Sequence, residues 1–204
     1  MTRALVLALL LAAAALPARP AEPPVILVLG DSLSAGYGLV PGQGWVSLLQ
    51  QRLKQKGYGY RVVNASISGE TTAGGASRIA GELKRNRPAV VVIELGANDG
   101  LRGLPLQQTR SNLERMIKLS QAAGAKVLLV GMRMPPNLGR DYTQGFERTF
   151  GELSRLHKTA FLPFLLEPIA LDRNAFQADN LHPIASAQPK LRDHVWKSLA
   201  PLLK

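Results

Sequence analysis

The sequence predicts a single α/β domain, built as a three-layer α/β/α sandwich around a mostly parallel sheet. Five short apolar runs rich in Val, Ile and Leu alternate with five segments whose apolar residues recur at helical spacing. Strands that are apolar along their whole length are buried on both faces, as in parallel sheets covered by helices. The 204 residues are the size of one domain, and no linker or repeat divides them.

The first half of the chain predicts three strands and two helices. Residues 25–29 form an apolar run that ends at a glycine, and residues 60–64 and 89–95 are the next two strand-like runs. Apolar residues at helical spacing predict a helix over residues 45–53 and another over residues 76–83, which Pro88 brings to an end.

The second half continues the alternation. Residues 106–123 have one apolar face and Gly124 suits the end of that helix, after which residues 126–132 predict the fourth strand. Residues 146–156 and 191–199 carry the apolar stripes of the last two helices. The fifth strand, at residues 161–166, has the weakest pattern because Pro163 interrupts it.

Residues 1–21 have the pattern of a secretory signal peptide. Arg3 gives a positive start, residues 4–16 form an apolar run too short to span a bilayer, and small residues follow as far as Ala21. An uncleaved N-terminal anchor is the alternative. Cleavage would leave a domain of residues 22–204 and predicts a periplasmic or secreted protein. It would also remove Arg3 and Arg19, which lowers the formal net charge from +11 to +9.

The basic charge by itself does not indicate nucleic-acid binding. The Lys and Arg residues are scattered, without a long run or interleaved aromatic residues, so no nucleic-acid partner is expected. The charge does suit transient contact with an anionic membrane surface. The absence of cysteine excludes disulfides, a thiol nucleophile and Cys-based metal sites. His157 and His194 fall within helical patterns and are expected to be structural, so neither a metal nor a cofactor is predicted.

Residues suited to acyl transfer follow four of the predicted strands. In a parallel sheet the functional site lies beyond the carboxyl ends of the strands. Ser32 follows the first strand, Gly69 the second and Asn98 the third, while Asp179 and His182 follow the fifth. Each of them has a structural explanation by itself: Ser32 as a helix N-cap, Gly69 and Asn98 as turn residues, and His182 and Asp179 as a loop histidine and its surface neighbour. Together they supply a complete chemical set at one edge of the sheet.

The chemistry of this set is nucleophilic catalysis. A serine hydroxyl needs a base to take its proton, and His182 is suited to that task because imidazole titrates near neutral pH. Asp179 lies three positions before His182 and can curl back to orient the ring. The backbone N–H groups of Ser32 and Gly69 and the side-chain amide of Asn98 are candidate donors to the oxyanion. Ser32 also lies where a helix can begin, which would point its N–H into the site.

These four blocks resemble the SGNH family of GDSL-type hydrolases. Residues 30–34 look like the block that carries the family's nucleophile, and Gly69 and Asn98 resemble its oxyanion glycine and asparagine. Residues 179–182 are similar to its D-x-x-H dyad, and the blocks occur in the family's order over nearly the whole chain after residue 21. The resemblance implies a flavodoxin-like parallel sheet with strand order 2-1-3-4-5, and a monomer. It also implies hydrolysis of aryl esters, acyl thioesters and lysophospholipids.

Two loops are candidates for binding the acyl chain. Leu101, Arg102 and Leu104 lie in a segment with glycines at residues 100 and 103, which predicts a flap able to move over the chain. Met134 and Pro135 follow the fourth strand near the same edge, and methionine suits a groove for acyl groups of different lengths. The alternative is that these apolar residues belong to the core.

Three classes of function remain open at this point. The favoured one is a serine esterase or thioesterase that forms an acyl-enzyme on Ser32 and acts on a small acyl-ester or lipid substrate. The second uses the same site as a carbohydrate O-acetyl esterase or acyltransferase, although no aromatic platform for a sugar is evident. The third is a non-catalytic binding module, which would have no need of an Asp–His pair.

Overall fold

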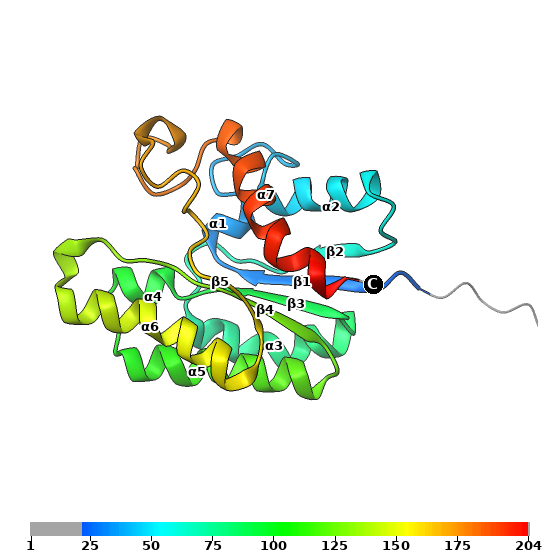
Figure 1. The fold of residues 1–204 in the computed structure, drawn as a ribbon, viewed down its shortest axis with the longest axis horizontal. Coiled ribbons are helices and arrows are strands. Elements are labelled where there is room, and N and C mark those ends of the chain that lie inside the picture. The colour runs from blue at the N-terminus through cyan, green and yellow to red at the C-terminus, as the bar shows by residue number, and fades with distance from the viewer. Residues whose placement is uncertain (1–21, 204) are drawn as a thin grey trace, which may run out of the picture.

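The computed structural model describes residues 22–203, so the predicted signal peptide lies outside the described residues. The five strands are β1 (Val25–Gly30), β2 (Arg61–Asn64), β3 (Val90–Glu94), β4 (Lys126–Val130) and β5 (Ala160–Leu162). They form one sheet in the order β2-β1-β3-β4-β5, and every neighbouring pair is parallel (Figure 1). The predicted fold class and strand order are confirmed.

Seven α-helices and four short 3-10 helices occur within residues 22–203. They are α1 (Ser32–Ala35), α2 (Trp45–Gln55), α3 (Thr72–Asn86), α4 (Ala97–Leu101), α5 (Leu106–Ala122), α6 (Arg140–His157), α7 (Gln188–Leu199), η1 (Pro136–Leu138), η2 (Arg173–Ala175), η3 (Ala185–Ala187) and η4 (Ala200–Leu202). The five longest match the predicted helices. The helix start expected at Ser32 is α1, whereas α4 was not predicted, because one turn is too short to show an apolar periodicity.

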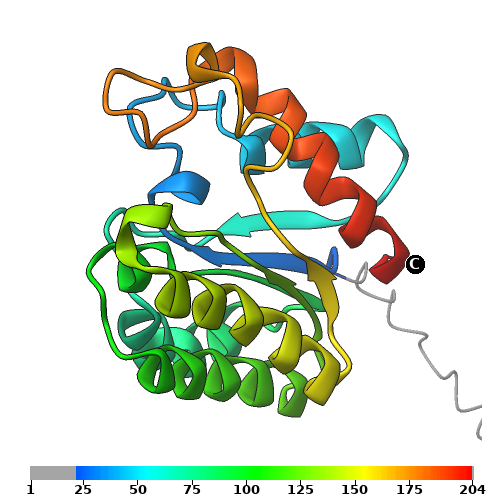
Figure 2. The same cartoon turned by 60° about the vertical axis from the view of Figure 1, so that its left-hand side comes forward.

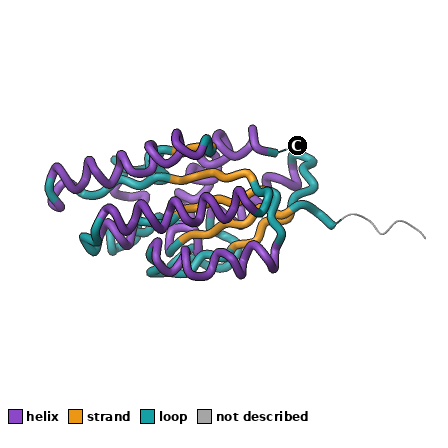
Figure 3. The backbone as a smooth tube through the Cα atoms, turned by 90° about the horizontal axis from the view of Figure 1, so that it is seen from below, coloured by secondary structure: helices purple, strands orange, loops and turns teal. Residues whose placement is uncertain are grey.

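The helices cover the two faces of the sheet in unequal numbers. On one face α2 packs against α7, and on the other α5 lies between α3 and α6 (Figures 1 and 2). Figure 3 shows the three long helices of the second group side by side against the strands. Each buries one apolar stripe, which in α6 includes Phe146, Phe150 and Leu153. Among residues 22–203, no helix has both the length and the hydropathy to cross a bilayer.

The centre of the core is formed by β1 and β3, which pair with each other. All six residues of β1 and all five of β3 are buried. Their last residues, Gly30 and Glu94, are register partners, so both strands end at the same level of the sheet. The loops that follow them therefore start from a rigid, closely packed base, which is the kind of support that a precise site needs.

The last two strands end earlier than the sequence pattern predicted. β4 stops at Val130 instead of residue 132, and β5 covers only residues 160–162. Pro163 has no N–H to donate to a neighbouring strand, so the chain leaves the sheet there. Residues 163–187 then make a long excursion, which Figure 1 shows in gold and orange at the end of the molecule opposite its C-terminus. This excursion carries Asp179 and His182.

Candidate active site

Three of the predicted site residues form one hydrogen-bonded chain at the carboxyl edge of the sheet. Ser32 is the first residue of α1 and comes two positions after β1 ends. Its Oγ lies 2.8 Å from Nε2 of His182. Nδ1 of His182 lies 2.7 Å from Oδ2 of Asp179. The hydroxyl, the imidazole and the carboxylate are thus connected in the order that a serine nucleophile requires.

The turn at residues 179–182 is held by the aspartate itself. Oδ1 of Asp179 accepts hydrogen bonds from the N–H groups of Leu181 (2.9 Å) and His182 (3.0 Å), which leaves Oδ2 for the imidazole. Asn180 has a φ of 56°, a left-handed conformation that asparagine tolerates. The N–H of His182, then its ring, and the N–H of Leu181 lower the pKa of Asp179 to about 2. An ionised carboxylate keeps the proton on Nδ1 and leaves Nε2 free to accept one from Ser32.

The three predicted oxyanion donors lie in the wall of the same cavity. Ser32 opens α1, so its N–H has no partner inside the helix. In the part of the chain that the structure describes, the N–H of Gly69 donates to no backbone acceptor. Gly69 has a φ of 80°, which glycine adopts without steric strain. Nδ2 of Asn98 donates to the Glu70 carbonyl (3.0 Å) and, over a longer distance, to Oδ2 of Asp31 (3.3 Å).

A cavity of about 590 Å³ opens beside Ser32 and is mostly apolar. Its apolar wall includes Leu33, Tyr37, Leu101, Met132, Met134, Pro135, Pro136, Phe164, Leu166, Phe176 and Leu181. The volume falls within the range of small-molecule sites. Phe164, Leu166 and Phe176 come from the excursion after β5. They were not predicted as site residues, because Phe164 and Leu166 fall within the run assigned to the fifth strand and Phe176 lies outside the D-x-x-H motif.

The predicted acyl-binding residues divide into two groups. Leu101, Met134 and Pro135 lie in the cavity wall, whereas Arg102 and Leu104 do not. The guanidinium of Arg102 donates to the Gly69 carbonyl (3.1 Å). The carbonyl of Leu104 accepts a hydrogen bond from the Tyr142 hydroxyl (2.8 Å). The segment expected to act as a flap is therefore tied to its neighbours on both sides.

Residues 28–188 match the model of the GDSL-like Lipase/Acylhydrolase family. The chain belongs to this family. It is 52% identical over 178 residues to Esterase TesA of Pseudomonas aeruginosa, with 87% of this chain and 89% of that protein covered. It is 40% identical over 185 residues to Thioesterase 1/protease 1/lysophospholipase L1 of Escherichia coli strain K12, with 91% and 88% covered. A crystal structure of TesA aligns with a TM-score of 0.85 at 51% identity, over 88% of this chain and 99% of that one.

Membership of the GDSL-like family identifies this chain as an ester hydrolase. Two residues outside the family motifs, Tyr37 and Gln177, contact the loop that carries His182. The ring of Tyr37 lies 4.5 Å from the imidazole, measured between centroids. Nε2 of Gln177 donates to the carbonyls of Tyr37 (2.9 Å) and Pro183 (3.3 Å), and the N–H of Gln177 donates to the His182 carbonyl (2.7 Å). One glutamine thus ties the loop after α1 to the loop of the histidine. Sequence reasoning could not find this contact, because its partners are 140 positions apart.

In this hydrolase, Asp99 connects the two loops that carry the predicted oxyanion donors Gly69 and Asn98. Its buried carboxylate accepts hydrogen bonds from the N–H (2.8 Å) and the hydroxyl (2.5 Å) of Thr72, at the start of α3. The hydroxyl of Thr109 in α5 lies 3.4 Å away. Asp99 adjoins Asn98 and Thr72 follows Gly69 by three positions, so the contact sets one donor loop against the other. Asp99 directly follows the predicted site residue Asn98 in the sequence, but its partners Thr72 and Thr109 lie in other helices and are brought to it by the fold.

We expect Asp99→Ala to lower the free energy of unfolding by about 2–4 kcal/mol, because it leaves the N–H and hydroxyl of Thr72 buried without their acceptor. Urea unfolding followed by circular dichroism measures the change. Glu152→Ala is the control, since it breaks only the exposed ion pair with Arg110 and should change the stability by less than about 1 kcal/mol. Equal effects of the two substitutions would contradict a stabilising role for Asp99.

Two buried carboxyl groups contact α1, the helix of this hydrolase that begins at Ser32. Asp31 caps α1 and accepts from the N–H of Leu33 (3.0 Å), while Glu94 accepts from the hydroxyl of Ser34 (2.6 Å). Burial raises the pKa of Asp31 to about 6. Burial and the nearby charge of Asp31 raise the pKa of Glu94 well above its usual range. Gly30 provides the space, since a Cβ there would lie 2.7 Å from Ser34 Cβ and 2.8 Å from Glu94 Oε2.

We expect Asp31→Asn to flatten the fall in stability between about pH 4 and pH 6. The pKa of Asp31 rises from 3.8 to about 6 on folding, so the folded state holds a proton that the unfolded state has lost in this range. Stability therefore falls as the pH rises, by about 3 kcal/mol for a shift of this size. Asparagine keeps an acceptor for the helix cap and does not titrate. Urea unfolding at pH 4 and pH 7 tests this, and equal pH dependence in both proteins would refute it.

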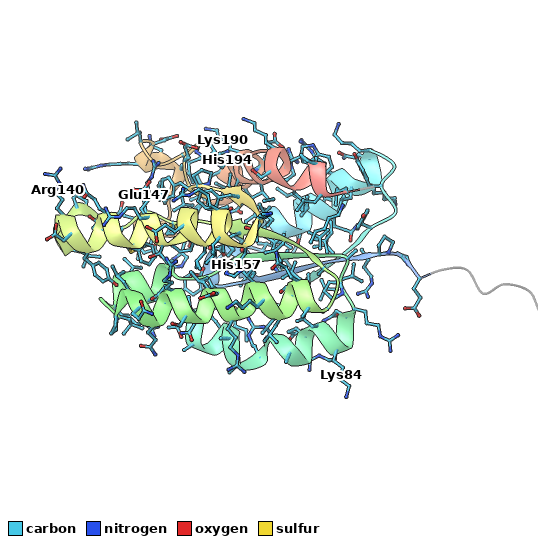
Figure 4. The ribbon with its side chains drawn as sticks, turned by 60° about the horizontal axis from the view of Figure 1, so that its bottom comes forward. Lys84, Arg140, Glu147, His157, Lys190 and His194 are labelled. Atoms are coloured by element: carbon cyan, nitrogen blue, oxygen red, sulfur yellow. The ribbon has the colours of Figure 1, made fainter. Side chains whose placement is uncertain are left out.

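The other two histidines of the hydrolase do not line the cavity. Nε2 of His157 lies 3.2 Å from Glu114, and Nε2 of His194 lies 3.0 Å from the Phe164 carbonyl. Figure 4 shows His157 on α6 and His194 on α7, which cover opposite faces of the sheet. Among residues 22–203, no three His, Asp or Glu side chains gather in a cluster suited to a metal ion.

Proposed function

We propose that this protein hydrolyses acyl esters through a covalent acyl-enzyme on Ser32. The observation that carries the proposal is the continuous chain of hydrogen bonds from Ser32 through His182 to Asp179, at the edge of an apolar cavity. A serine is a weak nucleophile unless a base removes its proton, and here the base is already within hydrogen-bond distance.

In the first half of the reaction, Oγ of Ser32 bonds to the acyl carbonyl carbon while its proton passes to Nε2 of His182. The bond between that carbon and the leaving oxygen or sulfur then breaks. His182 gives its proton to the leaving group, which departs as an alcohol, phenol or thiol. In the second half, water attacks the acyl-enzyme, His182 takes a proton from the water and returns it to Ser32, and the free acid leaves.

The negative charge on the carbonyl oxygen is stabilised by the N–H groups of Ser32 and Gly69 and by the amide of Asn98. A single donor of this kind contributes about 10²- to 10³-fold in rate. The 3.3 Å bond from Asn98 to Asp31 is the longer of its two, so it is the one that the oxyanion replaces. The bond to the Glu70 carbonyl keeps the amide in place during this exchange.

The apolar wall of the cavity supports an acyl chain as the part of the substrate that is recognised. Aryl esters, acyl thioesters and lysophospholipids all carry such a chain, and relatives of this chain are named esterase, thioesterase and lysophospholipase. A carbohydrate acetyl ester is less well supported, because the wall offers few polar groups for sugar hydroxyls. The reacting groups all come from one chain, so the proposed reaction needs no second subunit, which supports the proposal of a monomer. The pattern of residues 1–21 supports export to the periplasm or beyond.

Hydrolysis of p-nitrophenyl esters from acetyl to palmitoyl tests the proposed function. We expect kcat/KM to rise from acetyl to medium-chain esters, because each added methylene group is removed from water by the cavity. Acetylated xylo-oligosaccharides are assayed in parallel. A preference for the acetylated sugar over every p-nitrophenyl ester would refute the acyl-chain proposal.

We expect Met134→Ala to raise the ratio of long-chain to short-chain activity by roughly tenfold, since one lost side chain changes discrimination in an apolar pocket by this order. Met134 lines the cavity and packs against Gly100 of α4, so its removal extends the space along the wall. The measurement is kcat/KM for butyryl and decanoyl esters. Leu138→Ala, in the same loop but outside the cavity wall, should leave the ratio unchanged. An unchanged ratio in Met134→Ala would show that the acyl chain does not reach this residue.

A further inference from the structure

Large apolar side chains are exposed around the mouth of the cavity and form what we name the apolar rim. Its members are Tyr37, Val40, Ile67, Leu101, Leu171 and Leu181. Tyr37, Leu101 and Leu181 line the cavity themselves. Each of the others lies within three positions of a lining residue, and Leu171 is 100% exposed. The loops that carry the rim follow the carboxyl ends of β1, β2, β3 and β5.

The exposed apolar residues are concentrated at this mouth rather than scattered. Among the large hydrophobic residues exposed within residues 22–203, Leu156 is the one that does not belong to the rim. It lies near the end of α6, about 24 Å along the helix axis from Arg140, which begins the helix near the cavity loops. Figure 4 shows Arg140 and His157 at opposite ends of α6. Exposed apolar side chains concentrated around the loops of one cavity indicate an interaction surface.

The positive net charge of the chain favours an anionic partner. Arg102 adjoins Leu101 and Arg173 lies two positions after Leu171, and both are exposed. The exposed acids within two positions of a rim residue are Asp172 and Asp179, and the second of these is paired with His182. Arg133, in the cavity wall, lies over the ring of Phe164 and pairs with Glu147 at the surface. The chain after residue 21 carries a formal charge of +9, which attracts the whole molecule to an anionic surface.

We propose that the apolar rim docks on the surface of an anionic phospholipid aggregate, and that the hydrolase draws its amphiphilic ester from that surface. The inference rests on the proposed function for the reaction and adds the source of the substrate. Because the apolar wall continues from Leu101 and Leu181 at the rim to Ser32, an acyl chain can pass from the aggregate to the nucleophile along apolar surface. The rim side chains enter the lipid interface while the arginines meet the headgroups.

Flotation with lipid vesicles tests the docking, using Ser32→Ala protein so that the lipids stay intact. Vesicles of phosphatidylcholine are compared with vesicles that also contain phosphatidylglycerol. We expect this protein to bind the anionic vesicles. Adding Val40→Ser and Leu171→Ser should weaken binding about tenfold or more, since both side chains lose apolar burial. Adding Leu156→Ser instead should leave binding unchanged, because that side chain lies far from the rim.

Several outcomes would overturn the docking proposal. Equal binding with and without the rim substitutions would do so, as would a loss of binding with Leu156→Ser. Binding that vanishes in about 1 M salt, where charges are screened beyond about 3 Å, and that ignores the rim substitutions would be electrostatic adsorption alone. A dimer in sedimentation velocity that the rim substitutions dissociate would assign the rim to a second copy of this chain.

Activity assays separate the docking from the proposed function. With Ser32 intact, Val40→Ser/Leu171→Ser should hydrolyse soluble p-nitrophenyl acetate within about twofold of the wild type, because neither side chain lines the cavity. Its rate on micellar lysophosphatidylglycerol should fall about tenfold. Vesicle binding without any ester hydrolysis by the wild type would refute the proposed function and leave the docking standing. Ester hydrolysis by the wild type without rim-dependent vesicle binding would refute the docking and leave the proposed function standing.

Discussion

Replacing the proposed nucleophile should have the largest effect of any single substitution: Ser32→Ala is expected to lower kcat on p-nitrophenyl esters by at least about 10⁴-fold. The methyl group of alanine cannot attack the carbonyl, while the oxyanion donors and the apolar cavity remain. What activity survives would come from water attacking a bound, polarised ester. Affinity for a product fatty acid should stay within about threefold, because the cavity wall is unchanged.

Ser68→Ala is the matched control for this substitution. Ser68 lines the same cavity but has no hydrogen bond to His182. We expect its activity to stay within about tenfold of the wild type. Thermal unfolding of both variants checks that they fold. If Ser32→Ala kept more than about one hundredth of the activity while folded, another group would have to be the nucleophile.

The second large effect is expected from Asp179→Asn, which should lower kcat by about 10⁴-fold although it changes only one atom. The amide oxygen can still accept from the N–H groups of Leu181 and His182, so the turn survives. The amide nitrogen would then face Nδ1 of His182 as a donor, where the carboxylate now accepts. The imidazole would carry its proton on Nε2 and could not take one from Ser32.

Asp172→Asn provides the same chemical change in the same excursion. Asp172 caps η2 and accepts from the N–H of Asn174, with no contact to the imidazole. Its kcat should stay within about twofold of the wild type. The measurement is the steady-state kcat of Asp179→Asn and Asp172→Asn at pH 7. An Asp179→Asn enzyme with more than about one tenth of the wild-type kcat would show that this carboxylate does not set the tautomer of His182.

The sequence predicted the main parts of the candidate site because parallel strands bring their carboxyl ends to one edge. Ser32, Gly69 and Asn98 follow three strands that are neighbours in the sheet, with β1 between β2 and β3. Their convergence therefore follows from the fold class. Asp179 and His182 were predicted as a pair because a separation of three positions allows a carboxylate to reach the following ring, which it does.

The contacts that position these residues were beyond the reach of sequence patterns. The side chain of Gln177 donates a hydrogen bond to the carbonyl of Tyr37, which is 140 positions earlier in the chain. The carboxylate of Asp99 accepts hydrogen bonds from Thr72, which begins a different helix. Arg102 and Leu104 have the spacing expected of a flap, but hydrogen bonds to Gly69 and Tyr142 hold them outside the cavity wall. A sequence pattern indicates which residues are polar or apolar, but it does not indicate which hydrogen-bond partner each polar residue has in the folded chain.

By itself, the sequence determined the α/β sandwich, the edge of the sheet that carries the candidate site and the chemical types of the proposed reacting groups. These depend on local periodicity and on residue type, which are properties of short segments. Only the tertiary structure decided the shape of the cavity, the burial of Asp31 and Glu94, and the gathering of the apolar rim around the mouth. These depend on how the excursion of residues 163–187 packs over the sheet edge, and that packing is set by contacts between residues distant in the chain.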